Sequence, residues 1–403
     1  MRKHLKVVVA GDVDAGKSTL IGRFLYECGS LAEGALGNVG GSFPQRASDF
    51  EFAYLLDSFE EERREQLTID TTQAFCRDKK GREWLFIDVP GHRELIKNML
   101  VGSSYADAAV VVLDASCALK EQSKRHIQLL ELLGFERFIV AINKMDSFSY
   151  AEEVFKDKRA ELSAFLGKLE IKPLDCIPIS ARQGDNFIKS SRKTPWYKGK
   201  TLIEALDITS PRKNRDVFRL AIQDLYKVGR QVFAAGLIIS GKIKVGEKVI
   251  IMPSGEEGRV RQIKVFKTNV RTAAAPENVA LVLEGDNLLR RGMILCKTEL
   301  PDAGRKLSAK IFCLKDFDRR RSLNFKSLSQ AMPARIGHIY AIWDSADLKL
   351  KPKTAGLQEL DLAQIELNTE KSAVTEKFRG VNSLGRFVLE DKDGEICAAG
   401  VIS

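Results

Sequence analysis

The sequence predicts an α/β domain with a phosphate-binding loop (P-loop) and a doubly wound, mostly parallel sheet, followed by two β-barrel domains. Three observations carry this prediction. The first half of the chain alternates strand-like and helix-like runs, a glycine-rich pattern joins the first strand to the first helix, and the second half changes to short alternating strands. Alternating strands and helices are typical of a parallel sheet covered by helices, whereas short strands with turn residues between them are typical of barrels.

The first domain is predicted over residues 1–210. Its strand-like runs are Leu5–Gly11, Glu83–Val89, Ala108–Ala115, Arg137–Lys144 and Leu174–Ala181, and its helix-like runs include Ser18–Glu27, Glu94–Leu100 and Ser123–Gly134. The ligand of a doubly wound sheet lies at the carboxyl ends of its strands. The residues that directly follow these strand-like runs are therefore the first candidates for a site.

The second and third domains are predicted over residues 211–303 and 304–403. The stretch FAAGLIISGKIKVGEKVIIMPSGEEGRVRQIKVF, residues 233–266, breaks into short runs at glycine and proline turns. A similar texture resumes with LSAKIFCL and continues to GRFVLEDKDGEICAAGVIS at the end of the chain. Each region is expected to close into one barrel.

Composition argues against a disulfide-rich, zinc-binding or membrane-spanning protein. Seven cysteines are scattered without a C-x-x-C pair, so the sequence predicts neither a disulfide framework nor a zinc site. No run approaches the roughly 18 apolar residues of a membrane helix, and no signal peptide precedes the first strand, so a cytoplasmic protein without a membrane partner is expected. The net charge of +10 fits contact with nucleic acid or an acidic protein, and equally a solvated surface.

The stretch GDVDAGKST, Gly11–Thr19, carries the pattern G-x-x-x-x-G-K-[ST] directly after the strand-like run KVVVA. In that setting the backbone N–H groups of the loop cradle phosphates. Lys17 is predicted to reach the outer phosphates and the Ser18 hydroxyl to bind Mg²⁺. The residues predicted to contact the nucleotide here are Asp12, Val13, Asp14, Ala15, Gly16, Lys17, Ser18 and Thr19.

A second motif, DVPGH, ends the strand-like run Glu83–Val89. Asp88 is placed to reach Mg²⁺ through water, and the Gly91 amide is placed to sense the γ-phosphate. Thr68, between the P-loop and this motif, is the candidate for a second hydroxyl ligand of Mg²⁺. The predicted metal ligands are thus Ser18, Thr68 and Asp88.

Two further motifs predict a guanine base. In NKMD, Asp146 can accept hydrogen bonds from the N1 and N2 donors that adenine lacks, Asn143 meets the other side of the base, and the Lys144 stem packs on its face. In SAR, the backbone N–H groups of Ser180, Ala181 and Arg182 are placed to meet guanine O6. The cofactors predicted from the sequence are therefore GTP and Mg²⁺.

His92 is the candidate catalyst, together with Gly91 and Lys17. A histidine after a turn is more often a surface or core residue than a catalyst. Because His92 adjoins the predicted γ-phosphate sensor, we expect it to orient the water that attacks GTP.

The P-loop, DVPGH and NKMD motifs resemble the translation-factor class of GTPases, and the resemblance covers nearly the whole chain. It implies an α/β domain followed by two β-barrels. It also implies that Val13 and Leu67 form an apolar gate between His92 and the catalytic water, which a partner opens.

Within that class, STLIGRFLYE, FAYLLDSFEEERREQLTID, PISARQGDN and TPWYKGKTLIEALD resemble the GTPase subunits of bacterial ATP sulfurylase. This implies GTP hydrolysis coupled to formation of adenosine 5'-phosphosulfate by a small catalytic adenylyltransferase subunit, in a heterodimer or larger complex. The segment DVPGHRELIKNML is closer to the related elongation factor that carries aminoacyl-tRNA. That carrier is the alternative, with nucleic acid as its partner, and a regulatory GTPase without either role is a third possibility.

Overall fold

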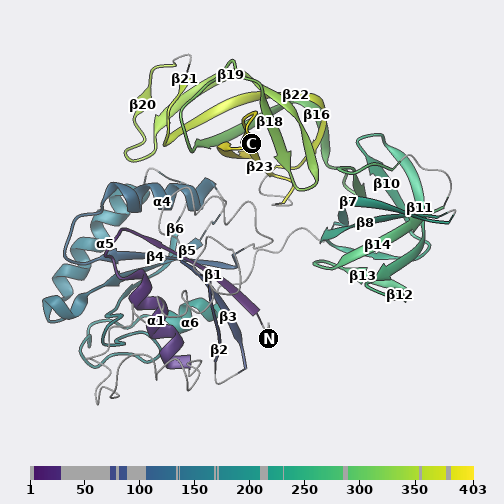
Figure 1. Cartoon of the computed structure of the whole chain (residues 1–403). Helices are drawn as coiled ribbons and strands as arrows, with labels where there is room; N and C mark the ends of the chain where they lie inside the picture. The colour runs from purple at the N-terminus through teal and green to yellow at the C-terminus, as the bar shows by residue number, and fades with distance from the viewer. Residues whose placement is uncertain are drawn as a thin grey trace. The chain divides into compact units, whose positions relative to one another are not determined.

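The computed structural model of this chain divides into two compact units, the first of residues 1–131 and 135–212 and the second of residues 132–134 and 213–403. Figure 1 labels the helices and strands of both units. The structure describes residues 4–28, 73–78, 81–88, 106–132, 135, 137–167, 169, 172–208, 217–229, 231–284, 289–353, 356–377 and 383–403. Within these ranges no helix is long and apolar enough to cross a membrane.

The first unit is built on a six-stranded sheet with the order β2-β3-β1-β4-β5-β6. Its strands are β1 (His4–Gly11), β2 (Gln73–Arg77), β3 (Glu83–Asp88), β4 (Ala108–Asp114), β5 (Arg137–Asn143) and β6 (Lys172–Pro178). Neighbouring strands are parallel, except that β2 is antiparallel to β3. The predicted doubly wound, mostly parallel sheet is confirmed.

Helices cover both faces of this sheet (Figure 1). They are α1 (Lys17–Cys28), α4 (Glu121–Leu132), α5 (Glu152–Leu166) and α6 (Leu202–Ile208). Side chains of α1 and α6 share one apolar cluster with alternate residues of the central strands, including Val7 and Val9. Val8, between them, is buried as well. Strands whose side chains are buried on both faces are typical of a parallel sheet covered by helices. In Figure 1, α4 and α5 lie on the opposite side of the sheet from α1 and α6.

The strand register aligns the carboxyl ends of the parallel strands. Val9 pairs with Asp88, Asp114 pairs with Asn143, and Ile142 pairs with Pro178. Because parallel strands end at one edge of their sheet, the residues that follow them meet there. The P-loop, the end of β3 and the NKMD motif therefore share one edge.

The first β-rich region of the second unit closes into a barrel. The strands are β7 (Arg219–Val228), β8 (Gln231–Ser240), β9 (Lys242–Lys244), β10 (Lys248–Met252), β11 (Glu256–Val265), β12 (Thr268–Val270), β13 (Thr272–Ala274), β14 (Asn278–Leu283) and β15 (Ile294–Cys296). The order β10-β15-β7-β8-β14-β11 is closed by pairing of β10 with β11. Closure leaves these strands without an unpaired edge.

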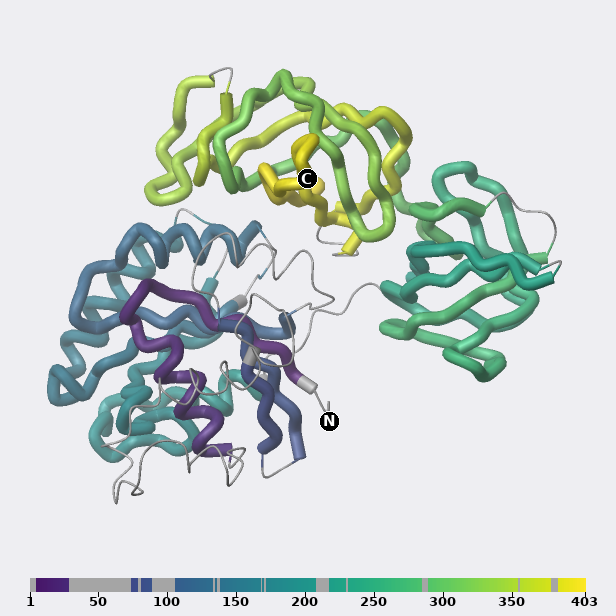
Figure 2. Tube along the Cα trace, viewed as in Figure 1, coloured from purple at the N-terminus to yellow at the C-terminus, as the bar shows by residue number. Residues whose placement is uncertain are grey.

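The second β-rich region is also a closed barrel. Its strands are β16 (Asp302–Cys313), β17 (Phe317–Asp318), β18 (Leu323–Ser327), β19 (Gln330–Asp344), β20 (Leu350–Lys351), β21 (Gly356–Leu357), β22 (Asp361–Thr375), β23 (Arg386–Glu390) and β24 (Ile396–Ile402). The order β18-β23-β24-β16-β22-β19 is closed by pairing of β18 with β19. The green-to-yellow course of the trace in Figure 2 follows these strands around one barrel to the C-terminus. The two predicted barrels are confirmed, while their residue boundaries stay predictions.

Among the described residues, contacts between the two barrels include an apolar cluster and a buried ion pair. Arg219, whose side chain is 2% exposed, places Nε 2.6 Å from Glu376 Oε1. Val217, Ile239 and Val374 belong to an apolar cluster that spans both barrels. Removing one partner of such a buried pair typically costs about 3–5 kcal/mol, because the other charge is left buried and uncompensated.

Candidate nucleotide-binding site

The predicted P-loop lies between β1 and α1, where its backbone adopts a conformation that needs glycine. Gly16 has φ +91°, and a Cβ atom built on it would lie 2.3 Å from Asn143 Nδ2. Asp14 is also in the left-handed region, with φ 64°. The Ala15 N–H donates to Asp12 O at 3.3 Å, which closes the turn before the helix. The glycine of the motif is thus required both by the backbone conformation and by the close approach of Asn143.

A Gly16→Ala variant is expected to bind GTP at least about tenfold more weakly, because left-handed strain alone costs about 1–3 kcal/mol and the new methyl group would displace Asn143. Titration with a fluorescent GTP analogue measures this. Gly394→Ala is the matched control, since Gly394 has φ +81° with nothing within 4 Å of its built Cβ. Wild-type affinity in the Gly16 variant would contradict this account of the loop.

Lys17 begins α1 and folds back over the loop. Its Nζ donates to Gly11 O at 3.1 Å and to Asp12 O at 2.8 Å. Burial lowers the pKa of Lys17, and the nearby carboxylates of Asp88, Asp12 and Asp14 only partly oppose this effect. Because its hydrogen-bond acceptors are neutral carbonyl oxygens, a phosphate anion would offset the desolvation of the ammonium group.

The donor set beside Lys17 fits Mg²⁺. Ser18 Oγ donates to Asp88 Oδ2 at 3.3 Å, which brings together the hydroxyl and the carboxylate predicted as ligands. Mg²⁺ prefers oxygen ligands and is usually held by one or two protein groups, waters and substrate phosphates. Ser18 and Asp88 would hold the ion, directly or through water, and the ion would neutralise charge on the phosphates. Thr68, the other predicted ligand, lies outside the described residues.

Asn143 connects two loops of the site. Its Nδ2 donates to Ala15 O at 2.9 Å, and its Oδ1 accepts from the Ala181 N–H at 2.9 Å. Asn143 is 3% exposed. The sequence predicts that Asn143 contacts the base. In the structure its side-chain amide also connects the P-loop to the SAR turn by hydrogen bonds. A contact of the Ala181 N–H with guanine O6 would replace or share the bond to Asn143.

Asp114 is a member of the site that the sequence analysis missed. It ends β4, and its Oδ2 lies 2.7 Å from Lys144 Nζ. Burial tends to raise the pKa of Asp114, but hydrogen bonds from Lys144 and Ser116 outweigh it and hold the pKa below its ordinary value. The ion pair holds the Lys144 stem beside the position predicted for the base. The sequence could have indicated Asp114, because it ends β4 just as Asp88 ends β3.

Asp146 lies in a short 3-10 helix, Met145–Phe148, that follows β5. Lys144 caps this helix in the left-handed conformation, with φ 65°. The Met145 N–H donates to Ile179 O at 3.2 Å, so the start of the helix is fixed to the segment that leads into the SAR turn. The carboxylate predicted to recognise guanine is therefore carried by a helix tied to the neighbouring loop.

The SAR turn is closed by its own hydrogen bonds and by α1. The Gly184 N–H donates to Ser180 O at 2.7 Å, and the Gln183 N–H donates to Ser180 Oγ at 3.1 Å. Arg23 Nη1 of α1 donates to Arg182 O at 3.2 Å. The two loops predicted to recognise guanine and the helix α1 are thus joined by hydrogen bonds.

Several predicted site residues cannot be placed. Gly91, His92 and Leu67 lie outside the described residues, as does Thr68. Val13, the other member of the predicted gate, is 61% exposed. The catalytic role of His92 and the gate stay predictions.

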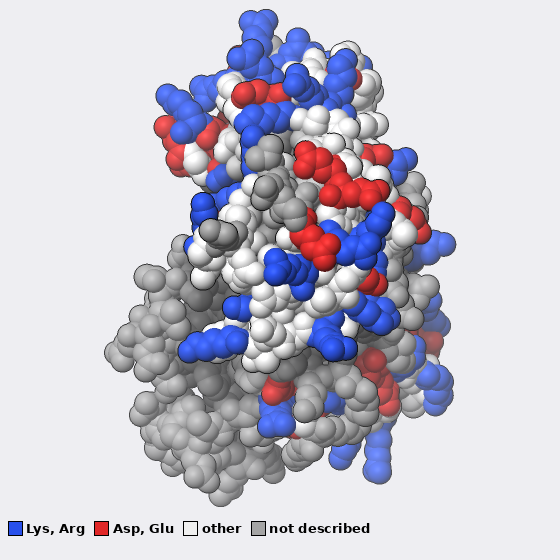
Figure 3. Space-filling model, turned by 90° about the vertical axis from the view of Figure 1, so that its right-hand side faces the viewer, with Lys and Arg blue, Asp and Glu red and all other residues white. Residues whose placement is uncertain are grey.

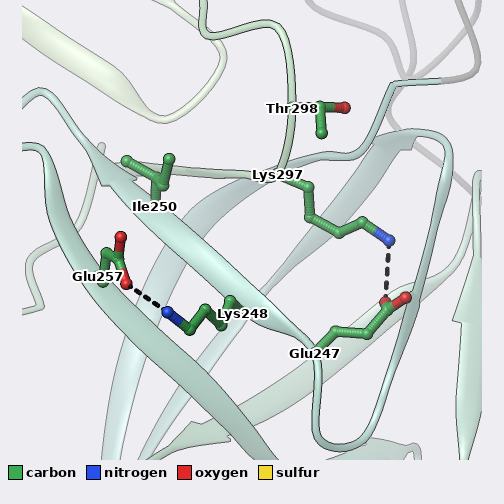
Figure 4. Close-up of a pocket in the computed structure, with 6 residues that line it drawn as sticks. All are labelled: Glu247, Lys248, Ile250, Glu257, Lys297 and Thr298. Atoms are coloured by element: carbon green, nitrogen blue, oxygen red, sulfur yellow. Dashed lines mark hydrogen bonds and ion pairs between the residues drawn. The ribbon is translucent and has the colours of Figure 1, made fainter.

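A shallow hollow of about 340 Å³ lies on the first barrel (Figure 4). It is lined by Glu247, Lys248, Ile250, Glu257, Lys297 and Thr298. Its charges pair with one another, Lys297 Nζ with Glu247 at 2.9 Å and Lys248 Nζ with Glu257 at 3.1 Å. It contains none of the predicted site residues.

Comparisons with known families match all three regions of the chain. The elongation factor Tu GTP binding domain matches residues 2–212, elongation factor Tu domain 2 matches residues 232–296, and the GTP-eEF1A C-terminal domain-like family matches residues 306–403. A solved structure of sup35 complexed with GDP covers 100% of this chain at 24% identity and a TM-score of 0.45, which carries no weight for function.

Curated relatives match over the full length. Elongation factor 1-alpha of Pyrobaculum calidifontis is 34% identical and covers 100% of this chain and 94% of its own length. The protein of that name from Methanothermobacter thermautotrophicus is 33% identical over 99% of this chain and 97% of its own length. The one from Pyrococcus furiosus is 34% identical over 100% and 98%.

These relatives correct the prediction of a GTPase subunit of ATP sulfurylase with a small catalytic adenylyltransferase partner, which is wrong. All four segments that suggested it lie in the first domain, between Ser18 and Asp207. The predictions of GTP and Mg²⁺ as cofactors are confirmed, since the matched model is that of a GTP binding domain. This chain belongs to the family of GTPases that includes elongation factor Tu and elongation factor 1-alpha.

Proposed function

We propose that this chain is a translation elongation factor that binds aminoacyl-tRNA in its GTP form and acts in the cytoplasm with the ribosome and a nucleotide-exchange factor. The observation that carries the proposal is the full-length similarity, at 33–34% identity, to proteins named elongation factor 1-alpha. The similarity covers both barrels as well as the GTP-binding domain. It therefore includes the parts of the chain that do not contact nucleotide.

The function assigns a separate role to each part of the nucleotide site. Lys17 binds the outer phosphates, Ser18, Asp88 and Thr68 hold Mg²⁺, and the NKMD and SAR loops select guanine. Gly91 senses the γ-phosphate and His92 orients the attacking water. Hydrolysis then ends the state in which tRNA is bound, as is general for switches that respond to the γ-phosphate.

The charge of the chain is compatible with a tRNA partner. The net charge is +10, and on the face shown in Figure 3 many Lys and Arg side chains lie at the surface among fewer Asp and Glu. Arg320 and Arg321 are exposed between β17 and β18. Contacts of Lys and Arg with phosphates supply sequence-independent affinity for nucleic acid and make it depend on salt.

We expect the GTP-loaded chain to retard charged tRNA in a gel at low salt, and the GDP-loaded chain to bind it at least about tenfold more weakly. Deacylated tRNA is the control for the aminoacyl group, and a salt titration should give a negative slope of log affinity against log salt. Equal retardation with GTP and GDP, or none at low salt, would refute the proposed carrier function.

A further inference from the structure

A further connection, outside the motifs themselves, joins the two loops that are predicted to recognise guanine. Tyr150, which follows the 3-10 helix that carries Asp146, donates its hydroxyl hydrogen bond to Asp185 Oδ2. Asp185 follows the SAR turn, and its backbone carbonyl accepts from the Ser180 N–H at 3.4 Å. The bonds of Asn143 and of the Met145 N–H join the starts of the two loops, whereas the bond between Tyr150 and Asp185 joins their far ends.

Asp185 is held as a carboxylate by three donors. Ser191 Oγ donates to Oδ1 at 2.6 Å, and Lys193 Nζ donates to Oδ2 at 3.1 Å, beside the hydroxyl of Tyr150. The Asp185 side chain is only 14% exposed. Burial tends to raise the pKa of Asp185, but the three hydrogen bonds outweigh it and hold the pKa below its ordinary value. Asp185 is therefore an ionised acceptor at neutral pH.

Tyr150 is held in an unfavourable backbone conformation that directs it to this acceptor. It has φ 59°, and Ser149 before it has φ 49°. A bulky residue in the left-handed region costs free energy and persists only when surrounding contacts hold it. The contacts are present, since Trp196 Nε1 donates to Tyr150 O at 3.0 Å and Lys193 Nζ lies 5.0 Å from the centre of the Tyr150 ring. Burial and the neighbouring Asp185 raise the pKa of Tyr150, so the phenol remains a donor.

We propose that Tyr150 and Asp185 are positioning residues for guanine, whose hydrogen bond fixes the spacing between the Asp146 carboxylate and the SAR turn. Asp146 is predicted to accept from the N1 and N2 donors of guanine and the SAR turn to meet O6, so both contacts can form together only when this spacing is correct. As positioning residues they act through the two loops and not by contact with the base. The inference concerns the nucleotide site alone and stands whether or not the chain carries tRNA.

The test uses Tyr150→Phe and Asp185→Asn in the full chain, with GDP and the diphosphate of 2-aminopurine riboside as ligands. The analogue keeps the 2-amino group but lacks both O6 and the N1–H, so it gains nothing from the SAR turn and keeps one donor to Asp146. We expect each variant to bind GDP about tenfold more weakly. A tenfold change corresponds to about 1.4 kcal/mol, which is the typical net contribution of one hydrogen bond. Binding of the analogue should change less than about twofold, so the preference for GDP over the analogue falls.

Lys200→Ala is the matched control, because it removes a partly exposed ion pair to Asp175, at 3.3 Å, in the same domain. It should leave both affinities unchanged. Equal weakening of GDP and the analogue would overturn the proposal, since a merely structural role loosens the site for both ligands. Unchanged GDP binding would overturn it too. Tyr150→Phe keeps the ring, so it decides the question even if Asp185→Asn fails to fold.

Discussion

A Lys17→Met variant is expected to lose GTP binding while its nucleotide-free form melts at the wild-type temperature or above. Charge-assisted hydrogen bonds contribute about 1.5–3 kcal/mol each, so losing those to the outer phosphates should weaken GTP binding by about 100-fold or more. Stability should not fall, because burial already disfavours the ammonium group and lowers the pKa of Lys17. A methionine removes that buried charge and keeps the apolar stem.

The lowered pKa of Lys17 also determines how the stability of the folded chain changes with pH. Between the lowered pKa of Lys17 and its ordinary value of 10.5, the unfolded chain binds more protons than the folded chain. The wild type therefore gains stability as pH rises through this window, and Lys17→Met should lack that gain. Thermal melts with and without GTP at neutral and alkaline pH measure both effects, with Lys156→Ala as an exposed-lysine control. A large loss of stability together with retained GTP-induced stabilisation would contradict the assignment of Lys17.

An Asp146→Asn variant is expected to exchange guanine selectivity for xanthine selectivity. The carboxylate accepts from the N1 and N2 donors of guanine, whereas an asparagine amide can donate to the O2 acceptor that xanthine carries there. Leaving a donor of the base unpaired costs about 1–3 kcal/mol, so GTP affinity should fall about 10- to 100-fold. XTP affinity should rise by a similar factor.

Competition of GTP, XTP and ATP against a fluorescent nucleotide measures this exchange. Asp157→Asn on α5 is the matched control, since it makes the same chemical change away from the site. Parallel loss of GTP and XTP binding in the Asp146 variant would mean that the residue supports the loop without recognising the base.

The fold, and the sheet edge on which the predicted site residues lie, could be predicted because their signals are local. The β-branched runs of β1, β4 and β5 identify the parallel sheet, and the strand ends place Lys17, Asp88 and Asn143 at one edge. The contacts of Asn143 with Ala15 and Ala181 could not be predicted, because they join residues far apart in sequence.

The role of Tyr150 was hidden for the same kind of reason. Its bond to Asp185 depends on two consecutive left-handed residues after the NKMD motif, and neither is a glycine that would have signalled the turn. Non-glycine residues adopt this conformation only when long-range contacts hold it, so the sequence gives no direct sign of it.

The function predicted first was wrong for a different reason. GTP-site motifs encode contacts with the nucleotide, which related GTPases share, whereas partners are chosen by surfaces that carry no short motif. The segments around Leu20 and Arg182 therefore identified the class of GTPase and not what it works with. Relatives that match over the full length distinguish an elongation factor from a sulfurylase subunit, because the barrels as well as the GTP-binding domain contribute to the comparison.

The central claim, that this chain acts as an elongation factor, is tested most directly by dipeptide formation on ribosomes of the same organism. Ribosomes with a charged initiator tRNA in place would receive a second charged tRNA, GTP and this chain as the sole elongation factor. The account predicts dipeptide formation that requires GTP and disappears with Lys17→Met. No dipeptide above the level seen without the chain, although the chain has bound GTP, would contradict it.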